Sequence, residues 1–160
     1  MALNKSTLQI YLYNSLNSYP SASQAAADWT NAYYNYASLA TDPQNAFPQG
    51  LSSKTGSLYN SLYNIFNNPT TDPATVAGNM ANAFKNFWSG VQFLGAGCAS
   101  FVSSSDYSTL SSNLYSIFTA LSGDFQSKSQ EIADKLHTFT RSVYVVGIDA
   151  QGKPYSGNIS

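Results

Sequence analysis

The chain of 160 residues has few charged side chains: Asp, Glu, Lys and Arg make up only 9% of it, against about 25% in ordinary soluble domains. Seven Lys and Arg stand against eight Asp and Glu, so the formal net charge is −1. A net charge near zero gives little repulsion between copies and favours association. With an aromatic content of 14%, a feature of interfaces, this predicts a protein that functions in an assembly. A small monomer with an aromatic-rich core is the alternative.

The few basic residues are scattered along the chain rather than clustered. Neutralising the phosphates of a nucleic acid requires a patch of Lys and Arg. The N-terminal sequence MALNKSTLQI lacks the basic start and long apolar run of a signal peptide. The stretch VQFLGAGCASFV is too short, and too broken by glycine, to span a membrane. We therefore expect a soluble protein made in the cytoplasm, with neither nucleic acid nor a membrane as a partner.

Side chains suited to catalysis are equally scarce, since the chain has one His and one Cys. His137 falls on the polar flank of a predicted helix, and Cys98 lies in GAGCAS without a basic neighbour that would activate its thiol. Asp28 and Asp134 stand near the starts of predicted helices, where a negative charge offsets the helix dipole. The GAG at 95–97 is too short for a phosphate loop, and one His with one Cys cannot begin a zinc site. We expect no enzymatic activity, no catalytic residue, no cofactor and no metal.

Self-similarity is the strongest pattern in the sequence. The phrase LYNSL occurs twice and a looser copy, LYSIF, once, at 12–16, 58–62 and 114–118. An alanine-rich phrase follows each copy, and offsets of 51 and 106 residues from the first align the later two. The larger offset places His137 level with Asn31, and Asn82 falls at the same position of the middle copy. Apolar residues recur every three or four positions in both phrases, which indicates amphipathic helices.

The repeated unit is therefore a helical hairpin, with one shorter and one longer helix, over residues 4–41, 54–95 and 106–142. One amphipathic hairpin cannot bury its apolar stripe alone, so the three must pack together. We expect an all-α domain over 1–142, built as one bundle or as a short solenoid. Its predicted core is Leu12, Leu16, Trp29, Leu58, Leu62, Phe87, Leu114, Ile117, Leu136 and Phe139.

Capping and helix-breaking residues predict where the helices begin and end. We expect the first helix to end at Pro20, and the second to be capped by Ser21 or Ser23 and stopped at Asp42-Pro43. We expect Asp72 to cap the fourth helix, with Pro73 as its first residue, and Gly95 and Gly97 to end it. The fifth helix is expected to start at Ser105 or Asp106.

Residues 143–160 break the helical pattern. The β-branched run VYVVGI and the turn-forming DAQG predict a strand, a turn at 149–152 and a second extended segment. A two-stranded hairpin is marginal in water, so this arm must either fold onto the helices or pair with a strand of another subunit. In the second case it is an assembly arm that can be removed after Ser142 without unfolding the helices. Tyr144, Val146 and Ile148 would share one face, with Val145 on the other. The candidate interface residues are Tyr144, Val145, Val146, Ile148, Tyr155 and Ile159.

Three stretches carry a resemblance to a known group of proteins. They are A-x-x-W-x-x-A-Y at Ala26 to Tyr33, A-F-x-x-F-W-x-G-V at Ala83 to Val91, and a last helix that runs into a strand in HTFTRSVYVVGI. In this the chain resembles the small helical virion proteins encoded among the tail genes of tailed bacteriophages. The resemblance implies a structural, non-enzymatic subunit of a phage tail, baseplate or neck, located in the virion and bound to other virion proteins and to copies of itself. The alternative is a soluble helical adaptor or ligand-binding module.

Overall fold

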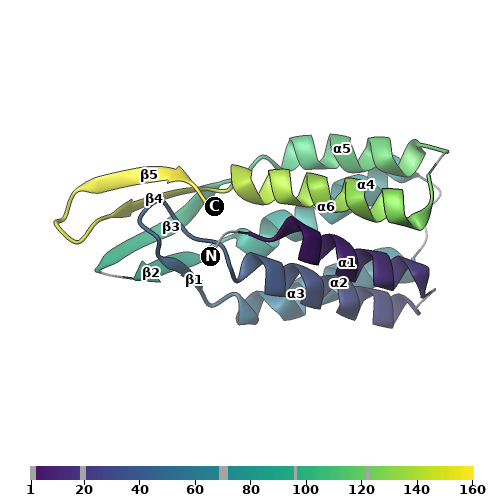
Figure 1. Ribbon diagram of the computed structural model, residues 1–160, viewed down its shortest axis with the longest axis horizontal. Helices are drawn as coiled ribbons and strands as arrows, with labels where there is room; N and C mark the ends of the chain where they lie inside the picture. Colours follow the sequence, from purple (N-terminus) through teal and green to yellow (C-terminus); the bar gives the residue numbers. More distant parts are fainter. Residues whose placement is uncertain (1–2, 19–20, 69–71, 96, 122) are drawn as a thin grey trace.

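A computed structural model describes residues 3–18, 21–68, 72–95, 97–121 and 123–160 of the chain. Over these ranges the chain forms six helices and five strands. In chain order they are α1 (Lys5–Asn17), α2 (Ala22–Ala37), β1 (Phe47–Gln49), α3 (Ser52–Asn67), α4 (Pro73–Trp88), β2 (Gln92–Gly95), β3 (Cys98–Ser104), α5 (Tyr107–Thr119), α6 (Phe125–Ser142), β4 (Tyr144–Ile148) and β5 (Pro154–Asn158). The helices lie side by side at one end of an elongated molecule, and the strands project from the other end (Figure 1).

The predicted all-α fold class is wrong, because the strands form one antiparallel sheet in the order β1-β2-β3-β4-β5. The protein is a mixed α/β fold in which each helical hairpin is followed by a strand or a strand pair. The fourth helix ends at Trp88, before the predicted stop at Gly95 and Gly97. Gly90 then turns the chain into β2 with a φ of 71°, a conformation that glycine adopts without strain. Strands as short as β1 and β2 carry too few residues for their alternation to stand out from a loop.

The six helices form a closed ring rather than an open solenoid. Each helix contacts the next in sequence, and α6 returns to contact α1. Closure buries the apolar stripes of the first and last hairpins against each other, whereas a solenoid would leave both exposed. Nine of the ten predicted core residues are buried, and Leu16 is partly buried against the core.

The longer helices of the three hairpins, α2, α4 and α6, have equivalent N-caps and equivalent buried positions. Their N-caps are Ser21, Asp72 and Asp124, which stand 51 and then 52 residues apart, and each cap side chain accepts a hydrogen bond from a first-turn N–H. The buried positions follow the same offsets, as in the sets Ala26/Ala77/Ser129, Trp29/Met80/Ile132 and Tyr36/Phe87/Phe139. The hairpin repeat therefore extends to the pattern of burial.

The third copy is misaligned in the sequence prediction by about one helical turn. The N-caps set its offset from the first copy at 103 residues rather than 106. His137 is accordingly equivalent to Tyr34 and Lys85, not to Asn31 and Asn82. Isolated matches of Ser, Gln, Ala and Asp misled the alignment, because they pair positions of unequal burial: Ser23 is exposed whereas Ser129 is buried, and Ala27 is partly buried whereas Ala133 is buried.

The repeated LYNSL phrase is displaced in the same way. The shorter helices share a buried pair of leucines four residues apart: Leu8 and Leu12, Leu58 and Leu62, and Leu110 and Leu114. The first LYNSL begins at the second leucine of its pair, whereas the other copy begins at the first leucine. The identical phrases therefore lie one turn apart in equivalent helices, although both present leucine to the core.

Other predicted boundaries have mixed outcomes. Ser21 caps α2, Asp72 caps α4 and Asp106 caps α5. Asp42-Pro43 is not the stop of the second helix, which ends at Ala37. Pro20 lies outside the described residues.

Each hairpin enters the sheet through the same junction. The backbone N–H groups of Ala40, Val91 and Val143 donate to the carbonyls of Ala37, Trp88 and Thr140, at 3.0–3.1 Å. All three donor residues are buried, at 0–1% exposure. The ring of Trp88 also stacks on Phe93 of β2, with 6.3 Å between ring centroids. The sheet is thus continuous with the bundle core.

The C-terminal arm belongs to this sheet. The predicted strand, turn and second strand correspond to β4, the turn around 149–152 and β5, but β4 pairs with β3 of the same chain. The arm therefore pairs with a strand of its own chain, rather than lying on the helices or pairing with another subunit. The last residue continues the pairing, since Ser160 and Thr41 exchange two backbone hydrogen bonds of 2.9 Å.

The segment between α2 and β1 covers one face of the sheet, which we call the inner face. Asp42 is buried there at 2% exposure, and its carboxylate accepts hydrogen bonds from the N–H groups of Gln44 and Ala46, at 2.9 and 2.8 Å. Its other oxygen accepts from the hydroxyl of Ser100 at 2.7 Å and from that of Tyr155. One carboxylate therefore ties the covering segment to β3 and β5.

Candidate functional site

The opposite, outer face of the sheet is open and largely apolar. One row across the five strands runs through Phe47, Leu94, Ala99, Ile148 and Pro154, and the next through Gln49, Gln92, Phe101, Val146 and Ser156. The four large apolar side chains of these rows, Phe47, Leu94, Phe101 and Ile148, are 46–56% exposed. We call these two rows together with Tyr144 the outer sheet face.

This face departs from the usual pattern of an antiparallel sheet with one open side, which alternates apolar inward and polar outward residues. Neither row contains a charged side chain. A contiguous exposed apolar surface of this kind marks a site of protein interaction more often than isolated exposed residues do. The outer sheet face is the leading candidate for an assembly surface.

The predicted interface residues divide between the two faces. Tyr144, Val146 and Ile148 lie on the outer sheet face, as their alternation predicted. Val145 and Ile159 are buried in the protein's own core at 0% and 1% exposure. Tyr155 lies on the inner face, where burial, with the hydrogen bond to Asp42, raises its pKa to about 12.

Sequence reasoning missed the part of the outer face that comes from the earlier strands. Phe47 and Leu94 face each other across β1 and β2, and Phe101 lies beside Val146. The available signal was the run QFLGAGCASFV, in which two short apolar segments stand on either side of the sequence Gly-Ala-Gly. A hairpin fits that pattern, but only the tertiary pairing shows which side chains share a face.

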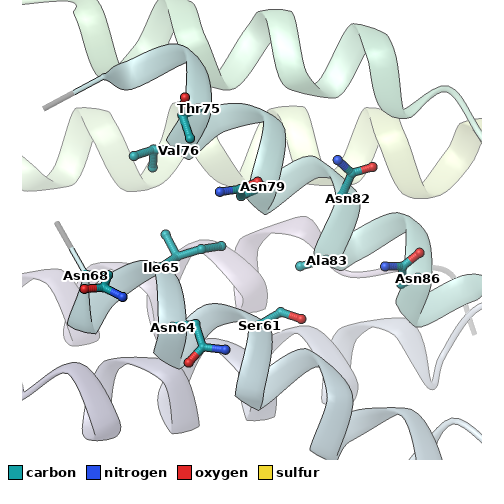
Figure 2. Close-up of a pocket in the computed structure, with 10 residues that line it drawn as sticks. All are labelled: Ser61, Asn64, Ile65, Asn68, Thr75, Val76, Asn79, Asn82, Ala83 and Asn86. Atoms are coloured by element: carbon teal, nitrogen blue, oxygen red, sulfur yellow. The ribbon is translucent and has the colours of Figure 1, made fainter. Parts of the chain in front are cut away.

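The bundle presents a second candidate, a groove between α3 and α4 with a volume of about 460 Å³. Its side chains come from both helices of the hairpin, and Ile65 lies between them (Figure 2). Its lining is Ser61, Asn64, Ile65, Asn68, Thr75, Val76, Asn79, Asn82, Ala83 and Asn86, half of it asparagine. None of these side chains is ionisable, so the groove is neutral at all ordinary pH values.

The first hairpin has an equivalent groove, of about 290 Å³, between α1 and α2. Its lining is Tyr11, Asn14, Ser15, Asp28, Asn31, Ala32 and Asn35. Three of its residues, Asn31, Ala32 and Asn35, correspond to Asn82, Ala83 and Asn86 at the 51-residue offset. Asn14 and Asn64 correspond as well, because each follows the second core leucine of its helix by two residues. We call these two sites the asparagine grooves.

The single His and Cys take no part in either surface. The Nδ1 atom of His137 forms a 2.6 Å hydrogen bond with the hydroxyl of Tyr36, which is buried. Burial, and then the charges of Arg141 and Lys5, lower the pKa of His137. The lowered pKa favours the neutral form of the imidazole. Cys98 is buried on β3.

The chain matches no protein-family model, no curated protein and no solved structure. Among the described residues, no group of three or more His, Cys, Asp and Glu side chains is placed to hold a metal ion. In the same ranges no helix combines the length and apolarity needed to cross a membrane. The outer sheet face and the asparagine grooves are therefore the features from which a function is inferred.

Proposed function

We propose that the protein is a non-enzymatic structural subunit that assembles through the outer sheet face. The observation that carries this proposal is the row of Phe47, Leu94 and Ile148, which crosses the sheet, contains no charged side chain and lies open to solvent. Burying apolar surface is the main favourable term in protein association. A surface that lacks charge also loses little solvation when it is covered.

The occupant we propose is a second copy of this chain. An apolar, uncharged face is complementary to itself, so two copies can meet across a twofold axis in an isologous contact. The chain's net charge of −1 adds almost no repulsion between copies. No charge pattern on the outer sheet face selects a partner of opposite charge.

The size of the face sets the strength of this contact. Five strands about 4.8 Å apart, each with two or three outward residues, cover on the order of 300 Å². A stable pair of proteins buries roughly 800 Å² on each partner. We therefore expect weak pairing of isolated copies, which becomes effective where a larger particle holds many copies together.

The resemblance to small helical virion proteins supports a viral particle as the setting. Within this proposal, the subunit belongs to a phage tail, baseplate or neck, and its partners are copies of itself and neighbouring virion proteins. The resemblance is carried by the helices and by the strand after the last helix. The sheet provides the contact surface that such a subunit requires.

Sedimentation velocity over a rising protein concentration tests the proposal with two matched variants. Ile148 on the outer sheet face and Ile10 on α1 are 56% and 58% exposed, so Ile148→Ser and Ile10→Ser remove the same side chain at the same exposure. We expect the wild type and Ile10→Ser to associate in the same concentration range, and Ile148→Ser to remain monomeric there. Circular dichroism confirms that both variants are folded. A wild type that stays monomeric up to about 1 mM, or an equal effect of the two variants, would refute assembly through the sheet.

A further inference from the structure

The asparagine grooves are unusual surfaces for helices. Asparagine is a poor helix former compared with Glu, Lys, Gln or Ala, yet α4 alone exposes Asn79, Asn82 and Asn86 toward one groove. In the described part of the chain, these three side chains make no hydrogen bond that would offset the low helix propensity of asparagine. Residues that break a local rule without a structural gain are expected at functional sites.

The grooves also recur at equivalent positions. Asn31 and Asn35 of the first hairpin match Asn82 and Asn86 of the second, on the corresponding faces of α2 and α4. In the third hairpin the positions of Asn31 and Asn35 are occupied by Asp134 and Thr138. Asp134 is engaged in an ion pair with Lys5. Two of the three hairpins therefore share the amide lining, whereas the third hairpin lacks these two asparagines.

We propose that the asparagine grooves bind a neutral, hydroxyl-rich ligand of the saccharide class. A primary amide offers two donor hydrogens and an acceptor oxygen, and a hydroxyl group both donates and accepts. A row of amides is therefore matched by a row of hydroxyls. In the second groove, Ile65, Val76 and Ala83 supply an apolar wall for the C–H surface of such a ligand. The lack of an ionisable lining residue there favours a neutral ligand.

The first groove adds three features that suit the same ligand. Ser15 is one of the lining residues of the groove, and its Oγ is buried without a hydrogen-bond partner. A buried hydroxyl without a partner is destabilising, and a ligand hydroxyl can supply what it lacks. Beside it, the ring of Tyr11 is 47% exposed and offers an apolar surface with a polar end. Asp28 contributes a carboxylate acceptor, which also receives a hydrogen bond from Gln24 at 2.7 Å.

A peptide is the main competing ligand, and the grooves fit it less well. Proteins recognise peptides through a free strand edge, an apolar helix groove, aromatic ridges for polyproline or clusters of Arg. The asparagine grooves have none of these. Asn79 and Asn86 are seven residues apart, which is about 10 Å along a helix and spans only about three residues of extended peptide.

Nuclear magnetic resonance can test the proposal on the full chain. Glucose, galactose and N-acetylglucosamine are titrated separately into ¹⁵N-labelled protein, and a neutral, blocked alanine tripeptide is titrated as the competing probe. We expect at least one saccharide to shift the side-chain amide signals of Asn31, Asn35, Asn82 and Asn86 in a saturable way. The tripeptide should shift none of them.

Variants separate the two grooves from the rest of the surface. Asn82→Ala with Asn86→Ala should weaken binding at the second groove at least tenfold, and Asn31→Ala with Asn35→Ala should do the same at the first. The matched control is Asn60→Ala, on an exposed position of α3 outside the groove, which should leave both affinities unchanged. Alanine favours helix, so these variants are expected to fold. The proposal is overturned if no saccharide shifts these amides at millimolar concentration, if the tripeptide alone binds, or if Asn60→Ala has the same effect as the groove variants.

Discussion

The indole Nε1–H of Trp88 donates a hydrogen bond of 2.8 Å to the phenol oxygen of Tyr33 in the centre of the bundle. The Tyr33 hydroxyl in turn lies 2.8 Å from Oγ1 of Thr140, whose hydroxyl donates to the carbonyl of Leu136. Tyr33, Trp88 and Thr140 come from α2, α4 and α6, the longer helices of the three hairpins. A single chain of hydrogen bonds therefore joins all three repeats.

Removal of the Tyr33 hydroxyl should destabilise the fold. Tyr33→Phe leaves the buried Trp88 N–H without its acceptor, and an unsatisfied buried donor costs about 1–3 kcal/mol. Tyr115→Phe, on an exposed face of α5, is the control and should change the free energy of unfolding by less than about 0.5 kcal/mol. Urea denaturation measures both. Equal effects of the two substitutions would contradict a structural role for this hydrogen-bond chain.

Stability should decrease in alkaline solution. Burial raises the pKa of Tyr33 and of Tyr36 well above the ordinary value of 10.0, and that of Tyr155 to about 12. Above pH 10 the unfolded chain loses phenol protons that the folded protein retains, so deprotonation favours unfolding. The free energy of unfolding should be insensitive to these groups below pH 10 and should fall above it. Urea midpoints measured across this range should decrease less steeply in Tyr155→Phe, and a flat wild-type profile would show that these phenols are not protected by folding.

The buried leucine pairs should carry more stability than their partly buried neighbours. Leu62 is 0% exposed, so Leu62→Ala should cost about 2–5 kcal/mol through lost burial and the cavity left behind. Leu16 belongs to the other copy of the LYNSL phrase but is only partly buried. Leu16→Ala should therefore cost clearly less, as measured by chemical denaturation. The reverse order would mean that the phrase itself, rather than its burial, determines stability.

Truncation after Ser142 should unfold the protein rather than release an arm. The deletion removes Val143, Val145 and Ile159, which are buried in the core, and leaves β3 with an open edge. We expect loss of the cooperative thermal transition measured by circular dichroism. A milder control removes only Ser160, which deletes the pairing with Thr41 and should lower the transition temperature without abolishing it. If the truncated chain kept the wild-type thermal transition, residues 143–160 would be an arm independent of the core, and this prediction would be wrong.

The candidate surfaces could be predicted from the sequence only in part. The alternation in VYVVGI correctly separates Tyr144, Val146 and Ile148 from Val145, because successive side chains of a strand point to opposite faces. The remaining outer-face residues lie on strands that are distant in sequence, and the pairing that unites them is not local. The asparagine grooves escaped notice for a similar reason, since each combines residues from two helices.

The sequence by itself determined the helices: amphipathic periods made all six, and Ser21, Asp72 and Asp106 capped three of them where expected. These features depend on interactions within a few residues, so they can be inferred from spacing alone. Only the tertiary structure decided that the helices close into a ring, that His137 is equivalent to Tyr34, and that the last strands pair with β3. These outcomes depend on which apolar surfaces meet. Several arrangements satisfy the same local pattern, and one is selected by contacts between residues far apart in the chain, such as Tyr33 with Trp88 and Thr140.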